Sequence, residues 1–267
     1  MKILTEQCAD YRMKILLIAV LSLLCIAFAG NVSAELTAKA NHDHIKIDFF
    51  YHGSTVSVRG ISDPGTDIII KMTSPEGNEV LREKDKVAGL IWMNSEELKI
   101  DNVPNVYFLH STKNIDDILG TGDSMKYVIG YNALGNHVAL TPAAQESEKA
   151  KWFQEFVKFK EASHLYGTST GKITLKQEDG KQDYYILTQW PYQAPPGTYT
   201  VTVYAVKDKK VIETAEATVL VEKTGIIKSL SNMAKKNGSL YGLISVIVAL
   251  GAGFGVGMIF KSGGGAH

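Results

Sequence analysis

The sequence predicts a mainly β protein: an immunoglobulin-like β-sandwich with an inserted amphipathic helix, followed by a single C-terminal transmembrane helix. Apolar and polar residues alternate in short stretches between residues 45 and 72, the pattern of strands that bury one face. A proline–glycine turn leads into an alternating segment at 195–204, as is common in late strands of immunoglobulin-like sandwiches. No charged residue occurs in 238–260. At about 1.5 Å per helical residue, this run covers the roughly 30 Å hydrocarbon core of a bilayer.

The N-terminal segment has the three parts of a secretory signal peptide. Two basic residues precede an apolar run over 15–29, and small residues follow at the cleavage point. We therefore expect 1–34 to be a signal peptide that is cleaved after Ala34. An uncleaved signal anchor is the alternative. Because Met13 stands directly before the basic residues, 1–12 is a candidate over-called start.

Removal of the signal peptide limits the chemistry of the mature chain. Both cysteines, Cys8 and Cys25, lie within it, so the mature chain has no thiol for a disulfide, a nucleophile or a metal site. Three of the 28 basic and two of the 28 acidic residues also lie there, which leaves a net charge near −1. This charge gives no electrostatic reason to expect nucleic acid as a partner. The remaining soluble part, 35–222, is expected to form the extracytoplasmic β-sandwich domain.

Strands are predicted in both halves of that domain. In the first half they are expected over 45–51, 55–61 and 67–72, the first two as a hairpin and the third as a central strand because its apolar run is continuous. The even spacing of short strands favours a sandwich over alternating β and α units. Further strands are expected over 106–110, 172–176, 183–188, 198–206 and 211–221.

A helical insertion is predicted at about 142–163. A threonine–proline pair at its start supplies an N-cap and a first-turn proline. Trp152, Phe156 and Phe159 follow at i, i+4 and i+7 on one helical face, and charged residues occupy most of the rest. This pattern predicts ordinary packing onto a sheet. A ligand-binding aromatic cluster is the alternative.

Three segments make up the predicted anchor. Apolar residues in 223–238 fall on one helical face, which predicts a juxtamembrane amphipathic helix in the headgroup region. The transmembrane helix is expected over 239–260, with 261–267 as a short cytoplasmic tail. Two lysines precede the span and one follows it, so the positive-inside bias mildly favours the opposite orientation. Because the signal peptide commits the whole domain to export, we expect a single-pass protein of the bacterial inner membrane with its N-terminal domain in the periplasm.

Two features are candidate partner-binding surfaces. Glycines in the span form two small-xxx-small pairs, which let helix backbones approach closely. They are Gly251 with Gly255 and Gly253 with Gly257. Trp92, close to the charged stretch 82–86, is the second candidate. The alternatives are the general abundance of glycine in membrane helices and an ordinary solvated face at 82–86.

The most specific polar cluster consists of His42, His44 and His52. His42 and His44 are two residues apart and would point to one face of a strand, where two imidazoles could bind copper or zinc. His52 lies toward the far end of the same predicted hairpin. A solvated segment just after the mature terminus is the alternative. No P-loop or H-E-x-x-H motif occurs in the sequence, and we expect neither enzymatic activity nor a cofactor.

Five collinear stretches are spread over nearly the whole mature chain: 56–60, 82–94, 103–107, 195–199 and 240–243. In this order they resemble the transmembrane protein family first grouped from alphaproteobacteria, a family of unknown function. The resemblance implies an exported N-terminal domain with a single C-terminal anchor. It also implies an accessory role beside a sulfite-exporter-type permease, and it supplies no catalytic residues.

Two functions from different classes are consistent with these features. The first is a membrane-anchored extracytoplasmic interaction or accessory protein, held by membrane lipid and working with an integral-membrane protein such as a transporter. Tethering raises the local concentration of its binding surface and so strengthens weak contacts. The second is a periplasmic metal- or anion-binding module centred on His42, His44 and His52. A hydrolase, a more distant third, would need a pocket that joins a nucleophile and a base.

Overall fold

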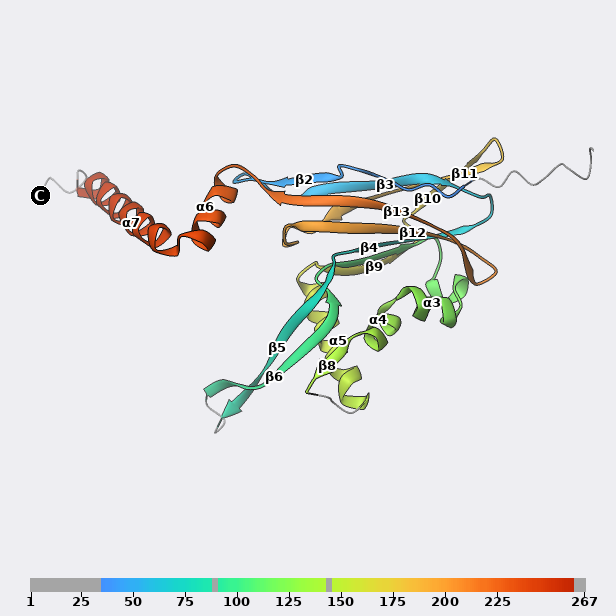
Figure 1. The fold of residues 1–267 in the computed structure, drawn as a ribbon, viewed down its shortest axis with the longest axis horizontal. Coiled ribbons are helices and arrows are strands. Elements are labelled where there is room, and N and C mark those ends of the chain that lie inside the picture. The colour runs from blue at the N-terminus through green and yellow to red at the C-terminus, as the bar shows by residue number, and fades with distance from the viewer. Residues whose placement is uncertain (1–34, 88–90, 143–145, 262–267) are drawn as a thin grey trace, which may run out of the picture. The chain divides into compact units, whose positions relative to one another are not determined.

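The computed structural model describes residues 35–87, 91–142 and 146–261. The chain divides into a unit of residues 1–35 and a unit of residues 36–267, and the elements below belong to the second unit. Most of them are strands, and a long apolar helix comes last, so the predicted mainly β class with a C-terminal apolar helix is confirmed (Figure 1). The predicted signal peptide lies outside the described residues.

Four strands form the first sheet, and every neighbouring pair in it is antiparallel. In spatial order they are β1 (Lys39–Asn41), β3 (Ser54–Ser62), β11 (Lys181–Trp190) and β10 (Thr174–Glu178). β3 and β11 pair over nine residues, from Gln182 opposite Ser62 to Trp190 opposite Ser54. β10 is shorter and covers only the first part of β11, residues 181–185.

Six strands form the second sheet. In spatial order they are β2 (His44–Ile47), β13 (Lys210–Lys223), β12 (Gly197–Lys207), β4 (Asp67–Thr73), β7 (Tyr107–Ser111) and β9 (Tyr166–Thr170). The central pairs are antiparallel, whereas both edge strands, β2 and β9, run parallel to their neighbours. The first strands of the chain are thus divided between the two sheets, because β1 joins the first and β2 the second.

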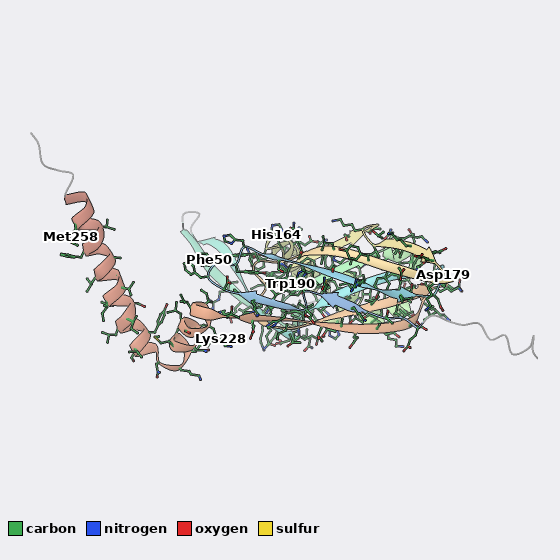
Figure 2. The ribbon with its side chains drawn as sticks, turned by 90° about the horizontal axis from the view of Figure 1, so that it is seen from above. Phe50, His164, Asp179, Trp190, Lys228 and Met258 are labelled. Carbon is green, nitrogen blue, oxygen red and sulfur yellow. The ribbon has the colours of Figure 1, made fainter. Side chains whose placement is uncertain are left out.

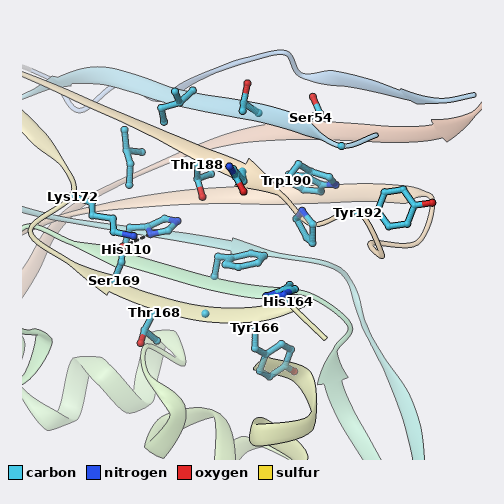
Figure 3. A pocket seen from close by; sticks show the side chains of 18 of the residues that line it. Ser54, His110, His164, Tyr166, Thr168, Ser169, Lys172, Thr188, Trp190 and Tyr192 are labelled. Carbon is cyan, nitrogen blue, oxygen red and sulfur yellow. Dashed lines mark hydrogen bonds between the residues drawn. The ribbon is translucent and has the colours of Figure 1, made fainter. Parts of the chain in front are cut away.

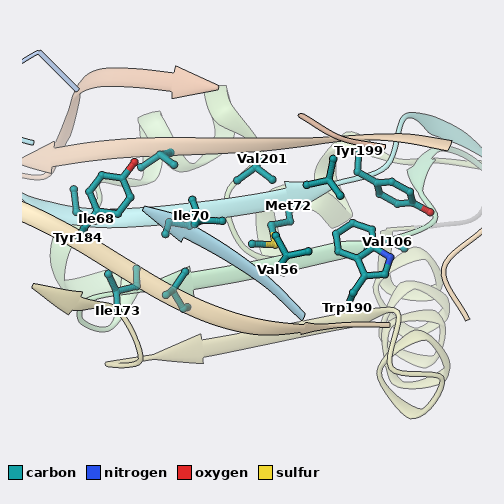
Figure 4. Close-up of a cluster of buried hydrophobic side chains, with 14 of the residues drawn as sticks. Val56, Ile68, Ile70, Met72, Val106, Ile173, Tyr184, Trp190, Tyr199 and Val201 are labelled. Carbon is teal, nitrogen blue, oxygen red and sulfur yellow. The ribbon is translucent and has the colours of Figure 1, made fainter. Parts of the chain in front are cut away.

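Alternating apolar side chains from both sheets form the core of the sandwich. On β3, Val56 and Val58 are fully buried, and on β12 Val201 and Val203 are as well. The same cluster contains Trp190 and Tyr199, whose rings meet edge to face with centroids 4.8 Å apart (Figure 4). Full burial of each such side chain stabilises the fold by roughly 1.5–3 kcal/mol, so this cluster holds the two sheets together.

A second layer covers the outer face of the six-stranded sheet. It contains the hairpin β5 (Glu76–Val87) and β6 (Ile91–Pro104), the strand β8 (Ala139–Thr141), and the helices α2 (Ile115–Ile118), α3 (Thr121–Tyr127), α4 (Tyr131–His137) and α5 (Glu146–Ala162). Ile69 on β4 and Leu109 on β7 are fully buried in this second core together with Phe156 of α5. Since Ile68 and Ile70 face the first core, β4 is buried on both faces, which explains its continuous apolar run.

The buried face of α5 differs from the predicted one. Phe156 is fully buried as expected, but Phe159 is exposed and Phe153 is buried in its place. The face continues to Lys160, whose Nζ lies 2.7 Å from Glu79 Oε1 and 3.0 Å from Asn105 Oδ1. The helix is therefore rotated relative to the prediction, and this lysine faces inward with the aromatic residues, against partly buried oxygen atoms beside the sheet.

Two helices end the described chain: α6 (Gly225–Lys236) and α7 (Gly238–Lys261). Within α7, Gly238–Met258 is long and apolar enough to cross a bilayer, and it is the one such helix among the described residues. Large apolar side chains of α7 are uncovered, for example Leu250 and Phe254, each 70% exposed. A helix of this composition requires an apolar environment that the rest of the described chain does not provide.

Candidate functional site

A cleft of about 1100 Å³ lies between the two sheets at one side of the sandwich. The end of β11 and the start of β3 line it from the first sheet, and β7 and β9 line it from the second. In Figure 3, Thr188 and Trp190 lie across the cleft from His110 and Ser169. Its volume is slightly above the roughly 300–1,000 Å³ of most sites that hold small organic ligands.

The strand pairing explains why the sandwich is open here. β9 is the edge of its sheet, and β10 covers only residues 181–185 of the outer edge of β11. In the part of the chain that the structure describes, no strand pairs with the outer edge of 186–190. The cleft is therefore bordered by two uncovered strand edges, one from each sheet.

His110 is the buried histidine among the described residues that line the cleft. It is 6% exposed, and its Nδ1 lies 2.6 Å from Ser169 Oγ, so β7 and β9 hold the two side chains together. Its Nε2 is buried without a hydrogen-bond partner among the described residues. Burial, with a smaller contribution from the charge of Lys172, lowers the pKa of His110 to about 4. The imidazole is therefore neutral at neutral pH, with one nitrogen available to donate and the other to accept.

Trp190 is a second buried polar group with an unused hydrogen bond. The residue is 3% exposed, and its Nε1 has no partner in the described ranges. Indole N–H can only donate, and an unsatisfied buried donor destabilises a fold by about 1–3 kcal/mol. His110 and Trp190 thus bring two buried polar atoms without a described partner to the lining of the cleft.

The cleft carries basic and neutral polar groups but no described acidic one. Lys172, His52 and His164 line it with hydroxyl-bearing residues of β3, β9 and β11, and none of the described lining residues is an aspartate or a glutamate. At the mouth, Tyr192 stacks on Tyr51 with ring centroids 6.0 Å apart. Burial, and secondarily Tyr192, raises the pKa of Tyr51. The arrangement suits a ligand with hydrogen-bond acceptors.

The three histidines predicted from the sequence lie in different surroundings. His52 lines the cleft, and its Nδ1 is hydrogen-bonded to the carbonyl oxygen of Phe50. His44 Nε2 lies 2.8 Å from Glu222 Oε1 on the neighbouring strand β13, whereas His42 is exposed with a φ of 59°. Across the described ranges, no group of three or more His, Cys, Asp or Glu residues is placed to hold a metal ion. The metal site stays a prediction without a geometric cluster behind it.

The predicted partner-binding residues lie elsewhere. The backbone of Trp92 belongs to β6, opposite Lys86 on β5, and its side chain is outside the described residues. The four glycines of α7 that were predicted to bind a partner have nothing within 4 Å of the position that a Cβ would occupy. Their helix faces are thus open to a neighbouring helix.

Sequence reasoning missed the central residues of the cleft. His110 ends the predicted strand 106–110, and it lies on the same face as Val106 and Phe108, which pack in the first core. Two signals were available: a histidine on an otherwise apolar strand face, and the G-x-S-x-G pattern of 167–171, whose serine is Ser169. In the structure Ser169 lies within β9 rather than on a strand-to-helix turn. Ser169, Lys172 and Trp190 could not be joined to it because only the pairing of β7 with β9, and of the two sheets across the core, brings them together.

A two-sheet sandwich covered by the three-stranded sheet β5–β6–β8, and followed by a helix of membrane-spanning length, defines a membrane protein with one candidate span in its described part. The chain belongs to the family described as Putative transmembrane protein (Alph_Pro_TM), whose model matches residues 35–262. This family match confirms the resemblance that was inferred from the sequence motifs. No curated protein matches the chain.

Proposed function

We propose that this chain is a membrane-anchored accessory protein that holds a periplasmic binding domain beside an integral-membrane transporter in the bacterial inner membrane. Its role is non-enzymatic interaction, and the family resemblance makes a sulfite-exporter-type permease the first partner to test. The observation that carries the proposal is α7, which combines membrane-spanning length, uncovered apolar side chains and two open glycine pairs.

The juxtamembrane helix supports the same function. Ile226 is 66% exposed and Leu230 40% exposed, on a helix that carries lysines at its end. A helix with exposed apolar residues and basic residues lies well in the headgroup region, where the apolar face enters the acyl boundary and lysines meet anionic lipid. The periplasmic side follows from the predicted signal peptide.

An immunoglobulin-like body fits this role, since such sandwiches commonly present binding surfaces. The strand order supports the assignment, because the first strand is divided between the sheets and β1–β3–β11–β10 corresponds to one sheet of such a sandwich. A further support is Tyr199, near the start of β12, whose hydroxyl donates to the carbonyl oxygen of Pro195. This is the arrangement of a tyrosine corner.

The partnership can be tested by co-expressing the full chain with a sulfite-exporter-type permease and crosslinking in the membrane. We expect the permease to be captured, and capture to fall when Gly251 and Gly255 are both replaced by leucine. A matched variant with Val256→Leu, which lies between the two glycine faces of α7, should capture it as the native chain does. Capture of only a second copy of this chain, or no effect of the glycine replacements, would contradict the proposal.

A second function, binding of an anion in the cleft, is favoured by one specific observation. The cleft joins Lys172 and the buried polar groups of His110 and Trp190 without an acidic lining residue in its described part. Calorimetry of the detergent-solubilised full chain with sulfate, sulfite and acetate tests it. Binding should be lost in Lys172→Ala and kept in Lys176→Ala. Titration with Cu(II) and Zn(II) tests the metal alternative, which requires loss of binding when His42 and His44 are both replaced by alanine.

A further inference from the structure

Two large aromatic residues occupy the corner of a tight turn after β2. Tyr51 N donates to the carbonyl oxygen of Asp48 at 3.2 Å, and Phe50 N donates to Asp48 Oδ1 at 2.9 Å, which closes and braces the turn. Phe49 and Phe50 are the two central residues, 70% and 76% exposed, with rings edge to face at 5.3 Å. Turn corners normally carry glycine, proline or small polar residues. Exposed phenylalanines on a hydrogen-bonded turn therefore point to a surface that requires them.

The pairing of β2 places this turn beside the exit of the membrane anchor. β2 runs parallel to β13, with Ile47 opposite Lys223, and Thr224 N donates to the carbonyl oxygen of Ile47 at 2.9 Å. Phe49 lies two residues after Ile47, and Gly225, the first residue of α6, lies two residues after Lys223. Since consecutive Cα atoms are about 3.8 Å apart, the turn starts within roughly 8 Å of Ile47. In Figure 2, Phe50 lies at the end of the β body from which α6 leaves, and Asp179 lies at the opposite end.

The distance to the bilayer is short on this side. The twelve residues of α6 span about 18 Å as a helix, and α7 begins two residues after it ends. Next to the turn, Tyr192 is 65% exposed and stacked on Tyr51, and tyrosine is enriched where proteins meet the membrane interface. Lipid is therefore the apolar phase nearest to Phe49 and Phe50.

We infer that the Phe49–Phe50 turn is a membrane-contact site: both rings enter the interfacial region of the bilayer that holds α7. The turn contacts the lipid surface, because the chain continues beside it from β13 into α6 and α7. The β body is thus held at the membrane at two points, its covalent anchor and this turn. The inference rests on the membrane anchoring proposed above.

Site-specific labelling of the full chain in vesicles of phosphatidylcholine and phosphatidylglycerol tests it. In a Cys8→Ser, Cys25→Ser background, single cysteines at Phe49 or Phe50 would carry an environment-sensitive fluorophore, each variant keeping the other phenylalanine. Lys181→Cys, at the start of β11 directly after the turn that contains Asp179, is the matched control at the far end of the body, and Val248→Cys reports the anchor. Circular dichroism checks that each variant keeps its strand content.

We expect the labels at 49 and 50 to shift to shorter wavelength and to be quenched by lipid-borne quenchers about two-fold or more above the label at 181. Adding Phe49→Ser should reduce the quenching of the label at 50. If the label at 248 is quenched by lipid while the labels at 49 and 50 are quenched no more than the label at 181, the proposed contact site is wrong but the anchor is retained. If 248 is exposed to water, the anchor itself is wrong. If the labels at 49 and 50 are shielded from water only when a permease is reconstituted with the chain, the turn contacts a protein partner and the lipid contact is wrong.

Discussion

His110→Asn should remove an acid-sensitive component of the stability of the β body. Asparagine places a polar atom near the position of Nδ1 and can keep the hydrogen bond to Ser169, now 2.6 Å in length. It has no titrating group and no unpartnered Nε2. The variant therefore separates protonation of the buried imidazole from loss of the side chain.

The magnitude follows from the two protonation equilibria. Burial, and secondarily the charge of Lys172, lowers the pKa of His110 to about 4, against 6.5 in the unfolded chain. Between these values the unfolded chain binds a proton that the folded chain does not, so the free energy of unfolding falls as pH falls from about 6.5 to about 4. The full loss is about 3 kcal/mol at roughly 1.36 kcal/mol per pKa unit, and it levels off below pH 4.

Denaturant unfolding of the detergent-solubilised chain, followed by near-UV circular dichroism from about pH 7 to about pH 4, measures this effect. Other groups titrate in the same range, so the relevant quantity is the difference between wild type and variant at each pH. His137→Asn, at an exposed histidine 2.8 Å from Glu76, is the matched control. Equal pH dependence in wild type and His110→Asn would refute the reasoning, because it would mean that the folded chain protonates His110 as readily as the unfolded chain does.

Two further predictions concern packing. Phe156→Ala should lower the free energy of unfolding by about 3–5 kcal/mol, because Phe156 is fully buried between α5 and the six-stranded sheet; chemical denaturation measures this, and a loss below about 1 kcal/mol would contradict the described burial. Gly60→Ala should destabilise the chain by about 1–3 kcal/mol, since its Cβ would overlap the carbonyl oxygen of Thr37 and force that segment away from β3. Gly77→Ala, with open space at the same position, should be close to neutral in the same denaturation experiment.

The sandwich was predictable where strands alternate or are continuously apolar. β3, β4 and β12 follow those patterns because local burial on one or both faces decides which residue types are accepted. The same principle predicted α7, in which no charged residue interrupts a membrane-length run. These elements depend on the sequence immediately around them.

The second layer was not predictable in this way. β5 is rich in charged residues, and the register of its pairing with β6 shifts twice along the hairpin. α3 has no buried residue and α4 is seven residues long, so neither shows a clear helical period. Lys160, a surface residue by type, faces inward because Glu79 and Asn105 supply oxygen atoms from distant elements. Pairings between distant elements, which periodicity does not record, decide these features.

The candidate site shows the same limit. His52 was selected from the sequence and does line the cleft, but its predicted companions His42 and His44 do not. His44 is engaged by Glu222, which lies on a strand that joins β2 only in the folded sheet. His110, Ser169 and Trp190 come from three strands spread over two sheets, so their proximity is a property of the topology.

The way in which β13 leaves the body determines how the molecule would bear mechanical load. A partner that pulls on the β body against the anchored α7 applies tension along β13, which is paired with β12 on one side and with β2 on the other. Because these hydrogen bonds lie across the direction of the pull, many of them must yield together rather than one after another. β13 is therefore expected to resist the pull, and the segment between β13 and α7, which contains α6, would extend first.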